Sequence, residues 1–171
     1  MRYLKLYALD ANDNDVSDIV FLDFHDDSRG KTLVRRAAAF DVSESGELDW
    51  VVAGDVNNDG VETYIDELMS IQFAQTFLEF KWVSVNRPFD SYLKVYAEKA
   101  ESPAIRGAVH LEFYRSNGAT KDAELVYTLT HHAGGDGQVP RIDANGDKII
   151  DAIDAVLLEK FTLMYAGFDW V

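Results

Sequence analysis

Cysteine is absent from the 171 residues of the chain. Its absence excludes disulfide bonds, thiolate zinc sites, iron–sulfur clusters and cysteine nucleophiles. Long apolar runs are absent too, since no stretch approaches the roughly 18 apolar residues of a membrane-spanning helix, and we expect no membrane span. The start of the chain, "MRYLKLYALD", lacks the apolar core of a signal peptide. Either the protein is not exported or a leader has been removed.

Positive charge is scarce. The chain has 16 lysines and arginines against 30 aspartates and glutamates, which gives a formal net charge of −14. So acidic a chain repels the phosphates of nucleic acids and anionic membranes, so neither is an expected partner. The hydrophobic content of 47% suits one or two compact domains with a real core. The composition fits a soluble protein, a cation-binding protein or a protein from a salty habitat.

Motifs for catalysis are also missing. The sequence has no G-x-S-x-G nucleophile elbow, no H-E-x-x-H and no phosphate-binding glycine loop. His131 and His132, with Asp136 nearby, form a group of the kind found in metal or acid–base sites. Neighbouring side chains on a strand point to opposite faces, so the two histidines cannot easily serve one ion. We therefore expect a protein that is not an enzyme.

The chain repeats itself in order. "RYLKLYA" from Arg2 returns as "SYLKVYA" from Ser91, at an offset of 89 residues. "DVNNDG" from Asp55 returns as "DANGDK" from Asp143, at an offset of 88. "IVFLDFH" returns as "AVHLEFY", and "FKW" returns as "FDW". These ordered matches indicate a tandem duplication, with one unit at 1–82 and the other at 91–171.

Both units follow one plan, for which we predict the α+β class. Each unit has an antiparallel β part, followed by an acidic loop and one helix; these loop–helix segments span 55–80 and 143–168. Alternation at period two predicts strands at Tyr3–Ala8, Val20–Phe24, Leu33–Phe40, Tyr92–Ala97, Val109–Phe113 and Glu124–His131, with a short strand at Leu48–Val52. Apolar stripes at helical spacing predict two helices whose stripes face the core and which pack as a pair. The stripes comprise Ile65, Leu68, Met69, Phe73, Phe77 and Phe80, and Ile153, Val156, Leu157, Phe161, Met164 and Phe168.

Oxygen side chains crowd into each acidic loop. Calcium takes about six to eight oxygen ligands, which loop positions 1, 3, 5, 7, 9 and 12 supply, with the position 7 ligand a backbone carbonyl. The first loop offers Asp55, Asn57, Asp59, the carbonyl of Val61, Thr63 and Asp66. The second offers Asp143, Asn145, Asp147, the carbonyl of Ile149, Asp151 and Asp154. We therefore predict two calcium ions as cofactors, each bound beside the start of a helix.

An aspartate at position 12 makes these loops resemble the calcium loops of dockerin domains, the modules that bind cohesins in bacterial cellulosomes. The resemblance covers less than a third of the chain and implies two EF-hand-like calcium sites. Lys148 replaces the glycine of position 6, where a positive φ would strain a side chain. Positions 10 and 11, the dockerin contact to cohesin, are Tyr64–Ile65 and Ala152–Ile153, which we expect to be buried.

Other interpretations of the acidic stretches remain open. Asp- and Asn-rich turns can simply be solvated. Integrin-like propeller blades and thrombospondin-type repeats also use D-x-N-x-D-G, but they do not continue into a long helical stripe. A third stretch, Leu9 to Val20, has Asp10, Asn12, Asn14 and Asp18 at partial loop spacing. It lacks an acid at position 12, so we predict a solvated loop there.

Together these observations predict a calcium-binding, non-enzymatic structural or assembly protein outside the cell or on a cell or particle surface. Its partner would be another protein or a second copy of itself, in a filament, tube, surface layer or capsid decoration. One alternative is a dockerin-like adaptor for a cohesin-type partner. Another is a carbohydrate-binding module that uses Trp50, Trp82 or Trp170 to stack on polysaccharide, although Trp82 and Trp170 occupy equivalent repeat positions, which favours packing.

Overall fold

The computed structural model describes residues 1–30, 32–81, 91–98, 107–115, 123–132 and 142–170. The expected joint between the repeats and Asp136 lie outside these residues. Within the described part, no helix is long and apolar enough to cross a membrane.

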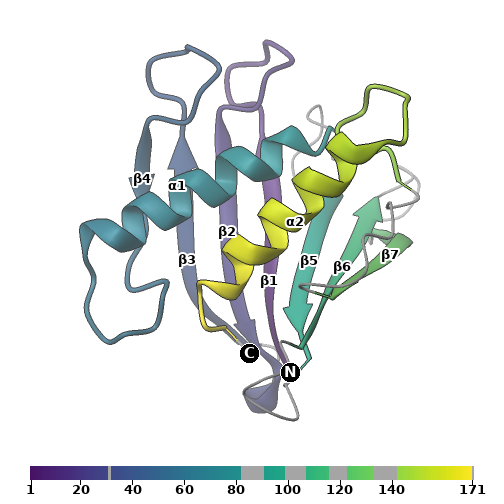
Figure 1. Cartoon of the computed structure of the whole chain (residues 1–171). Coiled ribbons are helices and arrows are strands. Elements are labelled where there is room, and N and C mark those ends of the chain that lie inside the picture. Colours follow the sequence, from purple (N-terminus) through teal and green to yellow (C-terminus); the bar gives the residue numbers. More distant parts are fainter. Residues whose placement is uncertain (31, 82–90, 99–106, 116–122, 133–141, 171) are drawn as a thin grey trace.

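Seven strands form one antiparallel sheet in the order β4-β3-β2-β1-β5-β6-β7 (Figure 1). The strands are β1 (Arg2–Leu9), β2 (Ile19–Asp26), β3 (Thr32–Phe40), β4 (Trp50–Val52), β5 (Ser91–Ala97), β6 (Ala108–Arg115) and β7 (Glu124–His132). The helices are α1 (Tyr64–Glu79) and α2 (Ala152–Ala166), with a 3-10 turn, η1, at Asp27–Arg29. Each strand predicted from the sequence is present.

The predicted fold class, α+β with tandem units, is wrong. The protein is mostly β, because the strands of both halves belong to one sheet rather than to two separate β parts. β1 pairs antiparallel with β5, with Leu4 opposite Val95 and Leu6 opposite Leu93. Alternation along a strand fixes which face is buried but does not say which strand lies beside it. The strand order is nevertheless symmetric about the β1–β5 pair, apart from β4.

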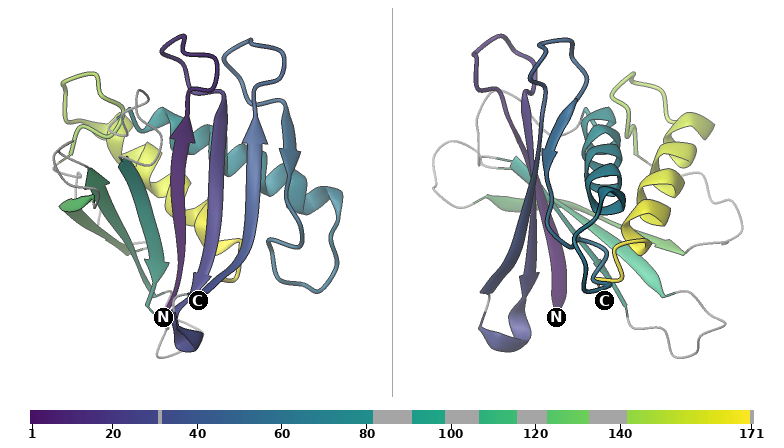
Figure 2. Two further views of the ribbon diagram at one scale, coloured as in Figure 1. Left: turned by 180° about the vertical axis from the view of Figure 1, so that it is seen from behind. Right: turned by 90° about the vertical axis from the view of Figure 1, so that its left-hand side faces the viewer.

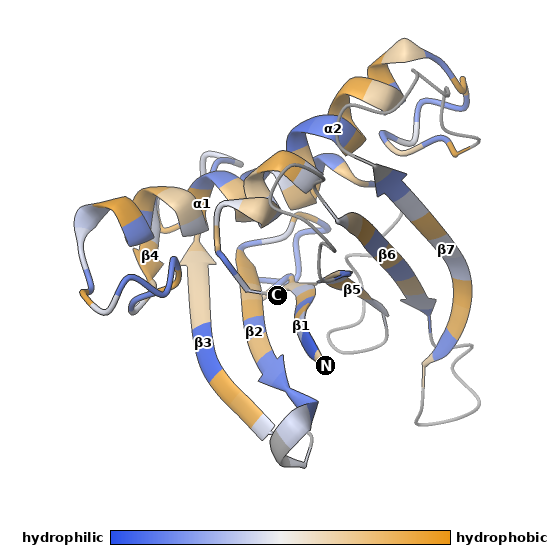
Figure 3. Ribbon diagram, turned by 60° about the horizontal axis from the view of Figure 1, so that its bottom comes forward, coloured by the Kyte–Doolittle hydropathy of each residue, from blue (hydrophilic) through white to orange (hydrophobic). Residues whose placement is uncertain are grey.

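Both helices lie on the same face of the sheet, as Figure 2 shows from the side. Alternate strand residues point toward the helices, and Figure 3 shows the resulting alternation of hydrophobic and hydrophilic positions along the strands. Leu4, Leu22 and Leu93 are fully buried on this inner face. The core therefore forms a single layer between sheet and helices.

The two helices contact each other through their second halves. Phe73 of α1 stacks on Phe161 of α2 with ring centroids 4.4 Å apart, and Phe80 meets Phe161 edge to face at 4.9 Å. The first turns lie outside this contact. Four residues of the predicted inward stripes are consequently exposed, which corrects that prediction. They are Ile65, Leu68, Ile153 and Val156.

Candidate metal-binding loops

The first candidate loop joins β4 to α1 and is folded around Asp55. The Asp55 carboxylate accepts the backbone N–H of Asp59 through Oδ1 and that of Gly60 through Oδ2, both at 3.1 Å. Asn57 Oδ1 also accepts the Asp59 N–H at 3.0 Å, and Asn57 Nδ2 donates to Asp59 Oδ2 at 3.1 Å. The predicted ligands at positions 1, 3 and 5 are thus brought together in one turn.

Asp66 closes this loop from within the first turn of α1. Its side chain is fully buried; Oδ1 accepts the N–H groups of Val56 at 2.9 Å and Asn57 at 3.1 Å. Oδ2 accepts the N–H of Thr63 at 2.8 Å, completing a capping box with that residue. Burial alone would raise the pKa of Asp66, but these hydrogen bonds outweigh burial, so the pKa is lowered.

The second loop, which precedes α2, has the same arrangement. Asp143 accepts the N–H groups of Asp147 at 3.0 Å and Lys148 at 2.8 Å. The fully buried Asp154 accepts the N–H groups of Ala144 at 2.7 Å and Asn145 at 3.2 Å through Oδ1. Its Oδ2 accepts the Asp151 N–H at 2.9 Å, which forms the second capping box. Asp147 Oδ1 accepts the Ile149 N–H.

Positions 9 of both loops act as helix N-caps. Thr63 Oγ1 accepts the N–H of Ile65 at 3.2 Å, and Asp151 Oδ1 accepts the N–H of Ile153 at 2.7 Å. An N-cap side chain satisfies an N–H group that has no partner within the helix. These two predicted ligands therefore have a structural role at the helix start in addition to any contact with an ion.

Positions 4 and 6 of both loops have left-handed backbone. In the first loop these are Asn58 and Gly60, with φ of 58° and 93°; in the second they are Gly146 and Lys148, with φ of 75° and 72°. Gly146 is also required by space, because a Cβ there would lie 2.9 Å from the Cβ of Lys81. Lys148 is the bulky side chain at the position where the first loop has glycine.

We expect Lys148→Gly to stabilise the protein by about 1 kcal/mol, because glycine adopts a positive φ without the Cβ clash. Chemical denaturation followed by circular dichroism measures the change. Gly60→Ala is the matched control; nothing lies within 4 Å of the added Cβ, so only the φ of 93° opposes it. The control should lose a similar amount, and a Lys148→Gly protein no more stable than the parent would contradict the expected strain.

Two hairpin loops repeat this hydrogen-bond pattern, and the sequence analysis missed one of them entirely. Asp41, between β3 and β4, accepts the N–H groups of Ser45 at 3.0 Å and Gly46 at 2.6 Å. Asp49 then accepts those of Val42 and Ser43. The signal was present as an aspartate at positions 1 and 9 with small polar residues at 3 and 5. It was overlooked because the closing acid comes at position 9 rather than 12.

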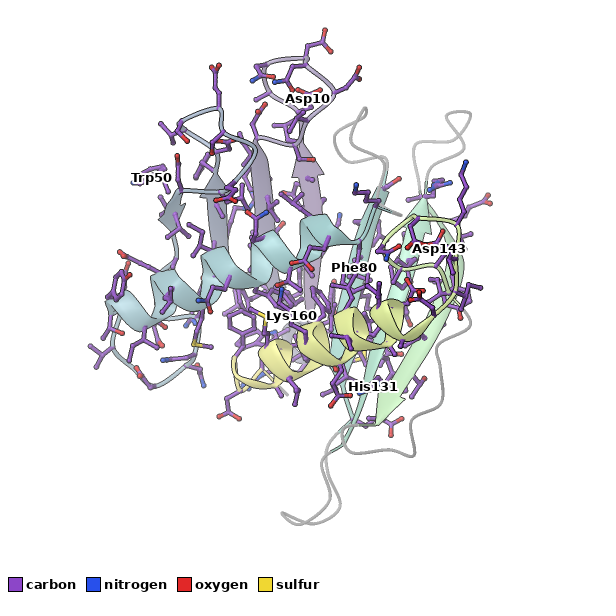
Figure 4. All side chains as sticks on the ribbon, turned by 45° about the horizontal axis from the view of Figure 1, so that its top comes forward. Asp10, Trp50, Phe80, His131, Asp143 and Lys160 are labelled. Carbon is purple, nitrogen blue, oxygen red and sulfur yellow. The ribbon has the colours of Figure 1, made fainter. Side chains whose placement is uncertain are left out.

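The hairpin loop between β1 and β2 has the same bonds. Asp10 accepts the N–H groups of Asn14 and Asp15, and Asp18 accepts those of Ala11 and Asn12. Residues 11–16 are exposed, as a solvated loop would be, but Asp18 is buried. Figure 4 shows Asp10 and Asp143 in separate loops. The acidic loops are thus four distinct turns, not one shared cluster.

The donor chemistry of the two helix-linked loops fits calcium, because every predicted ligand is an oxygen. The Asp55 and Asp143 oxygens each accept one N–H and retain a further lone pair, whereas both oxygens of Asp66 and Oδ1 of Asp154 already accept two hydrogen bonds each. Among the residues that the structure describes, no three acidic or histidine side chains already form a group that could hold a metal ion. An ion held by the acids of positions 1, 5 and 12 would therefore require these side chains to move closer together.

The remaining predicted features are spread over the molecule. His131 Nε2 lies 2.6 Å from Glu159 of α2. Trp50 is exposed, whereas Trp170 is buried and donates its Nε1–H to the Tyr3 carbonyl. Trp82 lies outside the described residues. No family model, curated protein or solved structure matches the chain.

Proposed function

We propose that the protein binds two calcium ions, one in each helix-linked loop, and acts as a calcium-stabilised, non-enzymatic assembly protein outside the cell or on a surface. The proposal rests on one observation, that the two loops have the same hydrogen bonds and the same buried aspartate at equivalent positions. Each has the same bonds from positions 5 and 6 to the aspartate at position 1, and the same buried aspartate at position 12. The two hairpin loops share the bonds to position 1, but the helix-linked loops differ from them in closing with a fully buried aspartate in the first turn of a helix.

The effect of the ion follows from the charges. The predicted ligands bring three negative charges into the first loop, from Asp55, Asp59 and Asp66, and four into the second, from Asp143, Asp147, Asp151 and Asp154. A divalent cation relieves this repulsion, and its binding to the folded state alone stabilises that state as free calcium rises. Asp66 and Asp154 belong to the capping boxes of α1 and α2. An ion that orders either loop therefore also stabilises the first turn of the helix that follows it.

Calorimetric titration of the chelated protein with calcium is the test, followed by light scattering for assembly. We expect two binding events and a particle mass that grows with calcium. Asp59→Ala and Asp147→Ala should each remove one binding event, because each substitution removes a predicted calcium ligand. Both variants should still fold, since both side chains are exposed and neither belongs to a capping box. Asp15→Ala, an exposed acid of the β1–β2 hairpin, is the matched control and should leave both events.

The number of calcium-binding events distinguishes further outcomes. Four events would mean that the hairpin loops at Asp10 and Asp41 also take ions. Two events at constant monomer mass would retain calcium binding and remove calcium-driven self-assembly. No heat at millimolar calcium, the range of extracellular modules, would show that the proposal is wrong.

A dockerin-like adaptor is the second candidate, and a specific observation favours it. Apolar side chains beside both loops are exposed: Val61 by 60%, Ile65 by 58%, Ile149 by 59% and Ile153 by 59%. For Ile65 and Ile153 this is contrary to the burial expected from the sequence. Exposed apolar groups at equivalent places suit docking to a partner. A pull-down with cohesins, with and without chelator, tests this; capture only in calcium supports it and no capture removes it.

A further inference from the structure

Helix α2 is apolar on two opposite sides. The side toward the sheet and α1 is buried. Ile153, Val156, Lys160 and Leu163 follow one another at intervals of three and four residues, which places them on one face, opposite the buried side. We call these four residues the outer stripe. Its three apolar side chains are exposed by 59%, 66% and 42% in chain order, and in Figure 2 no described helix or strand lies over them.

Helix α1 offers a comparison within the same molecule, because the sequence repeat gives each member of the outer stripe an equivalent 88 positions earlier. The equivalents are Ile65, Leu68, Gln72 and Gln75. This face of α1 is therefore apolar for its first turn only and then becomes polar, as the water-facing side of a surface helix normally is. In α2 the apolar face extends to Leu163, over about three turns. An exposed apolar surface of this length indicates a contact with another molecule.

The charges along α2 are balanced within one copy of the chain. Its three charged residues are Asp154, Glu159 and Lys160. Asp154 is buried in the capping box, and Glu159 lies 2.6 Å from His131 Nε2. Lys160 Nζ lies 2.8 Å from Glu79, so the single charge of the outer stripe is already paired. In α1, by contrast, all three charged residues are acidic: Asp66, Glu67 and Glu79.

We propose that α2 packs antiparallel against α2 of a second copy of this chain, with the outer stripes of the two copies in contact. A two-fold contact sets identical surfaces against each other, so a surface with uncompensated like charges repels itself. The outer stripe avoids this repulsion, whereas the matching face of α1, beside acidic charges only, does not. The inference rests on the assembly part of the proposed function, for which it names the partner and the surface. It does not rest on calcium binding.

Lys160 determines the orientation of the two helices. Antiparallel helices set Ile153 of one copy against Leu163 of the other, and Val156 against Lys160. The carbon chain of Lys160 then covers Val156, while its ammonium stays beside Glu79. Parallel helices would instead set Lys160 against Lys160 and bring two like charges together within the contact.

The ends of the outer stripe also suit the antiparallel orientation. The start of α2 in one copy meets the end of α2 in the other, which brings the exposed Lys148 toward the exposed Asp169. Two further acids at the start, Asp147 and Asp151, accept the N–H groups of Ile149 and Ile153 within their own copy. Both signs of charge are thus present where the two ends meet.

Sedimentation equilibrium from about 10 μM to about 1 mM protein is the first test, since a contact of a few helical turns is at the small end of specific interfaces. We expect a reversible monomer–dimer equilibrium both with chelator and with calcium. Val156→Lys should weaken dimerisation by at least about tenfold, because it places an unpaired charge in the contact. Leu68→Lys, at the equivalent exposed position of α1, is the matched control and should dimerise as the parent does.

The absence of cysteine from the chain permits a second test, of the orientation. Proteins with Ile153→Cys and Leu163→Cys, mixed under oxidising conditions, should form a disulfide-linked dimer, because antiparallel packing brings these two positions within reach of each other. Each cysteine variant alone should cross-link far less, since its two copies place that residue at opposite ends of the contact.

Thermal melts of each variant establish that the fold is intact. A parent protein that stays monomeric at every concentration would overturn the proposal and leave the outer stripe to a different protein. Equal weakening by Val156→Lys and Leu68→Lys, or cross-linking of each cysteine variant alone as readily as in the mixture, would also overturn it. A dimer in a protein that shows no heat of calcium binding would support this contact and remove the calcium part of the proposed function. Calcium binding by a protein that remains monomeric would have the opposite meaning.

Discussion

Replacing Phe161 by alanine is expected to lower the free energy of unfolding by about 3–5 kcal/mol, among the largest losses available to one substitution in this chain. The Phe161 side chain is fully buried, stacked on Phe73 at 4.4 Å and set edge to face against Phe80 at 4.9 Å. Removing it leaves a cavity where the two helices meet and forfeits both aromatic contacts.

Urea denaturation monitored by circular dichroism measures this loss. Leu163→Ala is the control on the same helix, because Leu163 is 42% exposed and its removal leaves little cavity. We expect the control to cost under about 1 kcal/mol. A Phe161→Ala protein that loses no more than the control would show that the helices do not pack through this ring pair.

Asp66→Ala is expected to destabilise the protein by about 3 kcal/mol even without calcium, because a buried N–H left unpaired costs about 1–3 kcal/mol. The substitution removes the acceptor of the Val56, Asn57 and Thr63 N–H groups and the capping box of α1. Glu67→Ala, one residue later in the same turn and exposed, is the control and should change stability little.

The dependence on pH gives the same residue a second test. The pKa of Asp66 is lower in the folded protein than its ordinary value, so the unfolded chain binds the proton more readily. Its contribution is therefore present above about pH 4, the ordinary aspartate pKa, and is lost as pH falls toward the lowered folded value. The difference in unfolding free energy between the parent and Asp66→Ala should become smaller as the pH falls from 7 to 3. A difference that stays constant would contradict this assignment.

The strands and helices could be predicted from the sequence because local patterns determine them. Alternation in "RYLKLYA" and "SYLKVYA" located β1 and β5, and the spacing of apolar residues located both helices, although each apolar stripe was expected to be buried along its whole length. The pairing of β1 with β5 could not be predicted, because hydrogen bonds between distant strands leave no periodic signal. That pairing decided the fold class, which is why the predicted class was wrong.

The candidate site was predictable to a similar extent. Aspartate spacing located both helix-linked loops and their closing residues, Asp66 and Asp154. It did not show that Thr63 and Asp151 cap the helices, since capping depends on where each helix begins. The exposure of Ile65 and Ile153 was also missed, because an apolar stripe does not show how far the partner helix extends.

The β1–β5 pair has a consequence for the order of folding. β1 is synthesised well before its partner at Leu93–Val95, because the rest of the first repeat unit lies between the two strands in the sequence. Until then β1 is an unpaired sheet edge with free N–H and C=O groups, open to association with other chains. Closing so long a loop is slow compared with forming the local hairpin of β1 and β2. The nascent protein therefore passes through a stage in which the strand that will lie near the centre of the sheet is an open edge that can pair with other chains.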